Sequence, residues 1–142
     1  VDGLFGPCDI FLSVAAVSDW RPKVRHAEKL RRGTGTPAAL ELEPCPDILR
    51  AMVARRRPDQ TLVGFAAEAG LTEEKARTKL RDKQVDFLAA NEVAGPAGAF
   101  GSDANTLLLL GADGSRRTLG PASKDEVSRQ LIAALAPRLL AR

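Results

Sequence analysis

Three apolar runs, each followed by a polar or amphipathic stretch, dominate the hydrophobic pattern of the chain. They occupy residues 9–17, 61–66 and 85–90. Runs that do not alternate apolar and polar positions are typical of parallel strands that are buried on both faces. We therefore predict three such strands, with the first of them at the centre of a sheet.

Two stretches with helical spacing separate these runs. Residues 46–57 begin with Pro46, which suits a first helical position, and Asp47, which complements the positive end of a helix dipole. The second stretch begins at Thr72, a good N-cap residue. Strands that alternate with helices predict right-handed crossovers and a parallel sheet.

The last third of the chain has a different pattern. Residues 106–110 and 116–119 flank Asp113-Gly114, which predicts a hairpin turn. Ser123 and the glutamate three residues after it form a capping box before a final amphipathic helix. The predicted fold class is α/β: a Rossmann-like, mostly parallel sheet flanked by helices, with a C-terminal β-hairpin and helix.

The length of 142 residues predicts a single domain over residues 1–142. Residues 20–40 break the pattern, because they combine many charges with Pro22, Gly33, Gly35 and Pro37. We expect this stretch to be a flexible flap with little regular structure.

Composition narrows the classes of function. No stretch approaches the ~20 apolar residues that a membrane span needs. The chain has 5 Phe, 1 Trp and no Tyr, so stacking platforms for single-stranded nucleic acid are absent. One histidine and two cysteines without metal-type spacing make a protein metal site unexpected. We expect free thiols and a cytoplasmic protein, with no nucleic acid or membrane as partner.

The first apolar run ends close to a lone acid, Asp19, and a loop rich in Lys and Arg follows it. Ligands of open α/β sheets bind at the carboxyl ends of the strands. A basic loop at such an end favours an anionic, phosphorylated ligand, and the acid favours a hydroxyl or amino donor on it. Alternatively, Asp19 is an ordinary turn residue and the loop charges are simply solvated.

Lys75, Lys79 and Lys83 recur every four residues and therefore share one face of the second helix. Such a row can hold a polyphosphate, although a solvated helix face has the same pattern. Phe65 is either a core residue or a platform for a base. Gly64, in the middle of a strand, indicates the close approach of another group, a ligand being one candidate.

Several motifs in register resemble one family, the phosphopantothenate–cysteine ligase (phosphopantothenoylcysteine synthetase) part of a bacterial bifunctional flavoprotein. The motifs are Ala15-Ala16-Val17-Ser18-Asp19-Trp20, Glu28-Lys29-Leu30-Arg31-Arg32, Pro46-Asp47-Ile48-Leu49, Gly64-Phe65-Ala66-Ala67-Glu68, Ala90-Asn91 and Phe100-Gly101-Ser102-Asp103-x-Asn105. They follow the family's order and spacing over nearly the whole chain.

The resemblance implies a ligase of coenzyme A biosynthesis. CTP would activate the carboxylate of 4′-phosphopantothenate as an acyl-cytidylate, and the amine of cysteine would then displace CMP. Mg²⁺ would accompany the triphosphate. The family also implies a homodimer and, in the parent chain, a fused flavin-dependent decarboxylase.

The resemblance also implies roles for individual residues. Lys29 would be catalytic, reaching the phosphates and the intermediate. Ala15 and Ala16 would line the site near the acyl group. The remaining nucleotide-binding positions would be Asp19, Pro46, Asp47, Ile48, Leu49, Phe65, Lys79 and Lys83.

The chain departs from the family pattern at three places. It has no N-terminal segment with a Gly-rich turn, Arg31 and Arg32 replace flap lysines, and Cys45, a poor N-cap, replaces an Asn. Two alternatives stay open: a non-catalytic nucleotide-binding fragment and a Rossmann-like dinucleotide-dependent oxidoreductase. Against the oxidoreductase stands the lack of a Gly-rich turn after an early strand.

Overall fold

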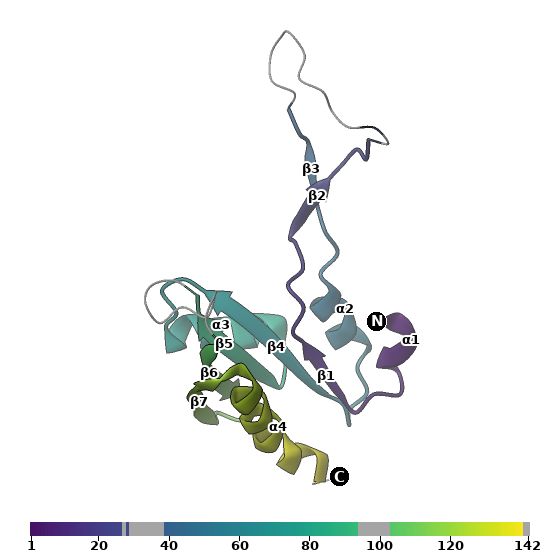
Figure 1. Ribbon diagram of the computed structural model, residues 1–142. Helices are drawn as coiled ribbons and strands as arrows, with labels where there is room; N and C mark the ends of the chain where they lie inside the picture. Colours follow the sequence, from purple (N-terminus) through teal and green to yellow (C-terminus); the bar gives the residue numbers. More distant parts are fainter. Residues whose placement is uncertain (27, 29–38, 94–102, 141–142) are drawn as a thin grey trace. The chain divides into compact units, whose positions relative to one another are not determined.

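The computed structural model describes residues 1–26, 28, 39–93 and 103–140 (Figure 1). The chain divides into two compact units. The first comprises Val1–Val14 and Leu49–Arg142, and the second comprises Ala15–Ile48. Each unit is considered by itself below.

A five-stranded sheet forms the first unit. Its strands lie in the order β1-β4-β5-β6-β7. The pairs β1–β4 and β4–β5 are parallel, whereas β5–β6 and β6–β7 are antiparallel. The α/β fold is therefore confirmed, with a mixed sheet. The strands are β1 (Ile10–Ser13), β4 (Thr61–Glu68), β5 (Phe87–Glu92), β6 (Ala104–Gly111) and β7 (Arg116–Ser123).

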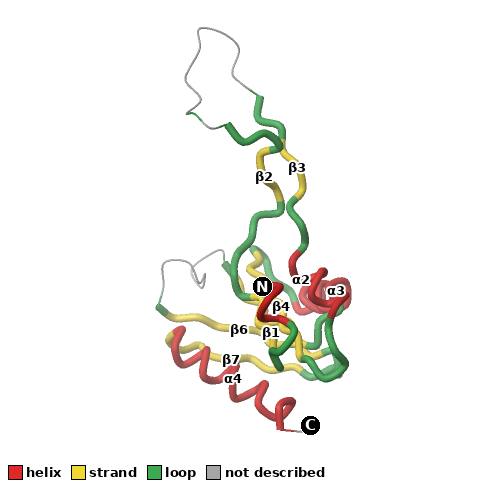
Figure 2. Tube along the Cα trace, turned by 90° about the vertical axis from the view of Figure 1, so that its right-hand side faces the viewer, coloured by secondary structure: helices red, strands yellow, loops and turns green. Residues whose placement is uncertain are grey.

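Helices cover both faces of this sheet (Figure 2). They are α1 (Asp2–Phe5), α2 (Ile48–Arg55), α3 (Glu73–Lys83) and α4 (Lys124–Leu140). Figure 2 shows α2 and α3 on one side of the strands and α4 on the other. On the α4 face, Val127, Leu131 and Leu135 pack with alternate strand residues such as Val63 and Leu109. Within the described ranges no helix is long and apolar enough to cross a membrane.

The first apolar run forms a shorter and less central strand than its sequence predicts. Only Ile10–Ser13 are in β1, their side chains are half-buried, and β1 lies at the edge of the described sheet. Val14 and Val17 are 58% and 61% exposed. The prediction of a central strand over residues 9–17 is therefore wrong, because an apolar run records hydrophobicity but not how many neighbouring strands pair with it.

Gly64 does face a close neighbour, as its sequence position predicts. A Cβ built at Gly64 would lie 3.2 Å from Leu88 Cδ1 and 3.3 Å from Leu49 Cδ2. The groups that approach the glycine are thus protein side chains, one of them from α2. The absence of a side chain at this position lets α2 pack directly on the sheet.

The predicted helix starts are right for α3 and α4 and two residues early for α2. Thr72 Oγ1 accepts a hydrogen bond from Lys75 N at 3.2 Å, and Ser123 Oγ accepts one from Glu126 N at 3.2 Å. Helix α2, in contrast, begins at Ile48, so Pro46 lies before the helix and not at its first position. Cys45 is not its cap either.

The predicted hairpin forms between β6 and β7. Gly114 has a φ of +87°, which glycine adopts without strain, and Ser115 N donates to Asp113 Oδ1 at 2.9 Å. Hydrogen bonds from Ser115 to the Asp113 carboxylate lower the pKa of that group. The Asp-Gly signal therefore located the turn correctly.

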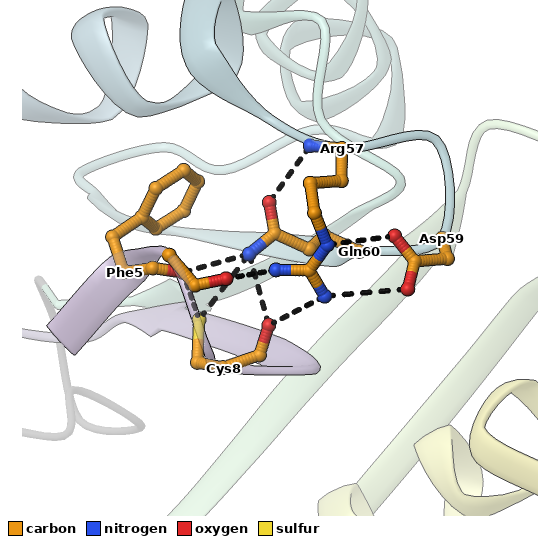
Figure 3. Close-up of polar contacts among 6 residues, drawn as sticks. Phe5, Cys8, Arg57, Asp59 and Gln60 are labelled. Carbon is orange, nitrogen blue, oxygen red and sulfur yellow. Dashed lines mark hydrogen bonds and ion pairs between the residues drawn. The ribbon is translucent and has the colours of Figure 1, made fainter.

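A buried amide attaches the first residues of the chain to the loop before β4 (Figure 3). Gln60 is 4% exposed, and its Nε2 donates to the carbonyl oxygens of Phe5 at 2.7 Å and Cys8 at 2.9 Å. Its Oε1 accepts from Arg57 N at 2.9 Å. Arg57 in turn pairs with Asp59, and this hydrogen bond raises the pKa of the guanidinium. These contacts fix the entry into β1.

The second unit contains an antiparallel ribbon that the sequence did not predict. Strand β2 (Trp20–Pro22) pairs with β3 (Leu42–Pro44). Arg21 Nε lies 2.7 Å from Glu43 Oε1, and Lys23 Nζ lies 3.2 Å from Glu41 Oε2. The expected flap thus has regular structure at its base, while residues 27 and 29–38 lie outside the described residues.

Candidate functional site

The carboxyl ends of the three parallel strands lead directly into the segments that the sequence singled out. Strand β1 leads into Ala15 and Ala16, β4 ends at Glu68, and β5 ends at Glu92. Glu68 and Glu92 are paired positions of neighbouring strands. Because ligands of open α/β sheets bind at this edge, it is the candidate site.

Lys79 reaches this edge from α3. Its ammonium group contacts the carboxylate of Glu68, with side chains 45% and 26% exposed respectively. Helical side chains lean toward the N-terminus of their helix, which explains how a residue in the second turn reaches back to the end of β4. Lys75, one turn earlier, donates from Nζ to the Gly70 carbonyl oxygen at 3.0 Å.

Glu92 organises the turn between β4 and α3. Its carboxylate accepts hydrogen bonds from Gly70 N at 3.1 Å and Leu71 N at 2.7 Å, and from Val93 N at 3.2 Å. Sequence reasoning included Glu68 in a family motif without giving it a role, and it missed Glu92. The same signal that singled out Asp19, an acid at the end of an apolar run, was present at each position.

Lys83 lies one helical turn beyond Lys79, about 6 Å further along the axis of α3. Phe65 follows Gly64 in β4 and points to the opposite face of the sheet, because neighbouring residues of a strand alternate between the two faces. Its partly buried ring packs against the core cluster on the α4 face. Leu49 packs over Gly64 on the other face.

The remaining predicted residues lie in the second unit, except Lys29, which lies outside the described residues. Ala15, Ala16 and Asp19 are exposed. The backbone oxygen of Asp19 accepts a hydrogen bond from Cys45 N at 2.8 Å, which extends the ribbon of β2 and β3. Pro46 and Asp47 follow directly, and Ile48 is the first residue of α2.

The carboxylates of this edge already bind protein groups. In the part of the chain that the structure describes, no group of three or more His, Cys, Asp or Glu side chains is placed to hold a metal ion. Both carboxylates at the strand ends are already engaged, Glu68 by Lys79 and Glu92 by backbone amides. Cys8 and Cys45 are free thiols, as expected.

A cavity of about 380 Å³ lies elsewhere, beside the start of β5 and the β6–β7 turn. Arg56, Arg77 and Arg81 line it, and Arg56 pairs with Asp86 at 3.2 Å. Arg56 directly follows α2, and Arg81 is in the last turn of α3. Basic side chains are favoured at such helix ends without any ligand, because they complement the helix dipole.

Comparisons with known proteins show the family of this chain. Residues 1–139 match the family model described as the DNA/pantothenate metabolism flavoprotein C-terminal domain. The chain is 35% identical over 133 residues to the coenzyme A biosynthesis bifunctional protein CoaBC of Bacillus subtilis, covering 94% of this chain and 32% of that protein. It is 38% identical over 127 residues to the protein of the same name from Thermococcus kodakarensis, covering 87% of this chain and 30% of that protein.

A solved structure has the same fold. The crystal structure of the C-terminal domain of a coenzyme A biosynthesis bifunctional protein CoaBC matches with a TM-score of 0.73 and 29% identity. The match covers 97% of this chain and 58% of that one. The chain spans about a third of the length of the curated relatives it matches.

Proposed function

We propose, because the chain belongs to the DNA/pantothenate metabolism flavoprotein C-terminal domain family, that it is the nucleotide-binding part of a phosphopantothenate–cysteine ligase of coenzyme A biosynthesis. The observation that carries this proposal is the family match over residues 1–139. The cationic side chains at the carboxyl edge of the sheet support it, because they suit an anionic substrate.

The proposed reaction has two steps. A carboxylate oxygen of 4′-phosphopantothenate attacks the α-phosphorus of CTP, the bond to the β-phosphate breaks, and pyrophosphate leaves. The amine of cysteine then attacks the acyl carbon of the acyl-cytidylate, CMP leaves with the bonding electrons, and the amine releases a proton to solvent. Both steps develop negative charge that positioned cations stabilise.

The roles proposed for individual residues follow from the family motifs. Lys29 contacts the reacting phosphate and the intermediate, and Lys79 and Lys83 bind the triphosphate. Ala15 and Ala16 lie near the acyl group. Asp19, Pro46, Asp47, Ile48, Leu49 and Phe65 complete the nucleotide site.

Mg²⁺ enters the proposal as part of the substrate. This ion usually keeps several waters and binds through substrate phosphates with only one or two carboxylates of the protein. The engaged state of Glu68 and Glu92 fits a metal that arrives with the triphosphate. We also propose that the protein works as a homodimer, which sedimentation analysis tests.

Release of pyrophosphate from CTP is the direct test of the ligase. We expect release that requires 4′-phosphopantothenate, and formation of the cysteine adduct only when cysteine is added. ATP in place of CTP tests the choice of nucleotide. CTP binding without pyrophosphate release would favour the alternative of a non-catalytic nucleotide-binding fragment, which the match to a third of each relative keeps open. Binding of NAD alone would favour an oxidoreductase and contradict the proposal.

Lys29→Gln tests the proposed catalytic residue. Removal of a cation from the reacting phosphate is expected to lower the rate of pyrophosphate release about 100-fold. Thermal unfolding serves as the check that the variant folds. The matched control is Lys23→Gln, which removes a cation that pairs with Glu41 at the base of the same segment. A normal rate in Lys29→Gln would refute the assignment.

A further inference from the structure

Glu68 ends one of the family motifs, but the proposed function gives it no role. Its side chain nevertheless contacts Lys79, a lysine of the proposed triphosphate site. Its carboxylate is 26% exposed and pairs with the 45% exposed Lys79. Exposed ion pairs contribute only about 0–1 kcal/mol to stability, because both groups remain hydrated. A contribution to folding stability is therefore a weak reason for a carboxylate to pair with a lysine at the candidate site.

The surroundings of this pair are held in place. Glu92 binds the amides of Gly70 and Leu71, and Lys75 binds the Gly70 carbonyl oxygen. Gly70 itself has a φ of +65°. Gly70 lies in the turn that joins β4 to α3, and both its N–H and its carbonyl oxygen are bonded to side chains. The Glu68–Lys79 pair connects β4 and α3, the two elements on either side of this turn.

We propose that Glu68 is a counter-anion that sets the affinity of this site for polyphosphates. In the free protein its carboxylate pairs with the ammonium group of Lys79, and a triphosphate or pyrophosphate that binds Lys79 must displace this carboxylate. Its negative charge also repels the ligand, most strongly the ligand with the highest charge. Glu68 thereby weakens the binding of triphosphate and favours the departure of pyrophosphate. This inference rests on the proposed function.

Glu68→Gln isolates the charge from the geometry, since the glutamine oxygen can still accept a hydrogen bond from Lys79. Calorimetric titration in the presence of Mg²⁺ is expected to show a Kd for CTP about threefold lower in this variant than in the unchanged protein, in line with the strength of exposed ion pairs. The Kd for CMP is expected to change little. The difference for CTP should shrink in high salt.

Two further variants separate the pair from general charge effects. Glu74→Gln removes the same charge from an exposed position in the first turn of α3 and should leave the Kd for CTP unchanged. In a Lys79→Ala background, which should weaken CTP binding more than CMP binding, Glu68→Gln should lose the part of its effect that comes from the contact with Lys79 and keep only the part that comes from repulsion of the ligand.

The outcomes distinguish the two proposals. If the unchanged protein binds neither CTP nor ATP, the proposed function fails and this inference with it. If CTP binds the unchanged protein and Glu68→Gln equally well, only the inference fails. Weaker CTP binding in Glu68→Gln would mean that the carboxylate supports the site instead of competing with the ligand, and would also overturn it.

Discussion

Gln60 connects three chain segments through one buried side chain. Its amide nitrogen binds the carbonyl oxygens of Phe5 and Cys8, and its oxygen binds the amide of Arg57. Loss of this side chain would remove one hydrogen bond from each of these three backbone groups, although Phe5 O would keep Cys8 N at 3.3 Å and Cys8 O would keep Arg57 Nη2 at 3.5 Å. A buried polar group that loses its partner costs more than the hydrogen bond itself contributes. One residue therefore controls how the start of the chain meets β1.

We expect Gln60→Ala to lower the free energy of unfolding by about 1–3 kcal/mol, measured by denaturant titration. Asp59→Ala is the control, since it removes an exposed pair with Arg57, and exposed ion pairs contribute little to stability. Equal losses in the two variants would show that the buried amide has no special weight.

At the scale of elements, the β6–β7 hairpin depends on two glycines for different reasons. Gly114 and Gly120 have φ values of +87° and +86°. A Cβ at Gly120 would lie 2.5 Å from the backbone oxygen of Asn105, whereas a Cβ at Gly114 meets nothing within 4 Å. Gly120 also lies near the irregularity in the ladder between Asn105 and Leu107.

Gly120→Ala is expected to destabilise the protein by clearly more than Gly114→Ala. Gly114→Ala has only the backbone cost of about 1–2 kcal/mol, and Gly120→Ala adds a clash with backbone atoms that cannot move aside. Thermal unfolding of the two variants side by side measures the difference. A smaller shift in melting temperature for Gly120→Ala would show that the ladder yields at this point.

At the scale of the whole molecule, Glu73 links α3 to the hairpin. Its carboxylate lies 2.9 Å from Arg77 Nε on its own helix and 2.9 Å from Arg116 Nε on β7. A hydrogen bond from Arg116, and to a lesser extent one from Arg77, lowers the pKa of Glu73. A carboxylate whose pKa is lowered on folding stabilises the folded state at pH values above its ordinary pKa of 4.5. This contribution is lost as the pH falls through the pKa of the folded state.

We expect the free energy of unfolding of the unchanged protein to decrease as the pH falls below about 5, partly because Glu73 becomes protonated. Glu73→Gln should flatten that dependence relative to the unchanged protein. Denaturant titrations across this pH range measure the slopes. Identical slopes in Glu73→Gln and the unchanged protein would exclude a contribution from this link.

Much of the fold could be predicted from local patterns. The helix starts at Thr72 and Ser123 and the turn at Asp113-Gly114 are confirmed, because caps and turns depend on residues three or four positions apart. The buried strands β4 and β5 were located to within two residues. The family resemblance is confirmed as well, since its motifs are local and in register.

The sequence by itself determined the order along the chain of the five sheet strands and of α2, α3 and α4, the two caps, the hairpin and the family. Only the tertiary structure decided that β1 is an edge strand, that Leu49 and Leu88 fill the space at Gly64, and that Lys79 meets Glu68. The physical reason is distance along the chain. Periodicity and capping arise from neighbouring residues, whereas the partner of a strand, a glycine or a lysine is set by how remote segments pack.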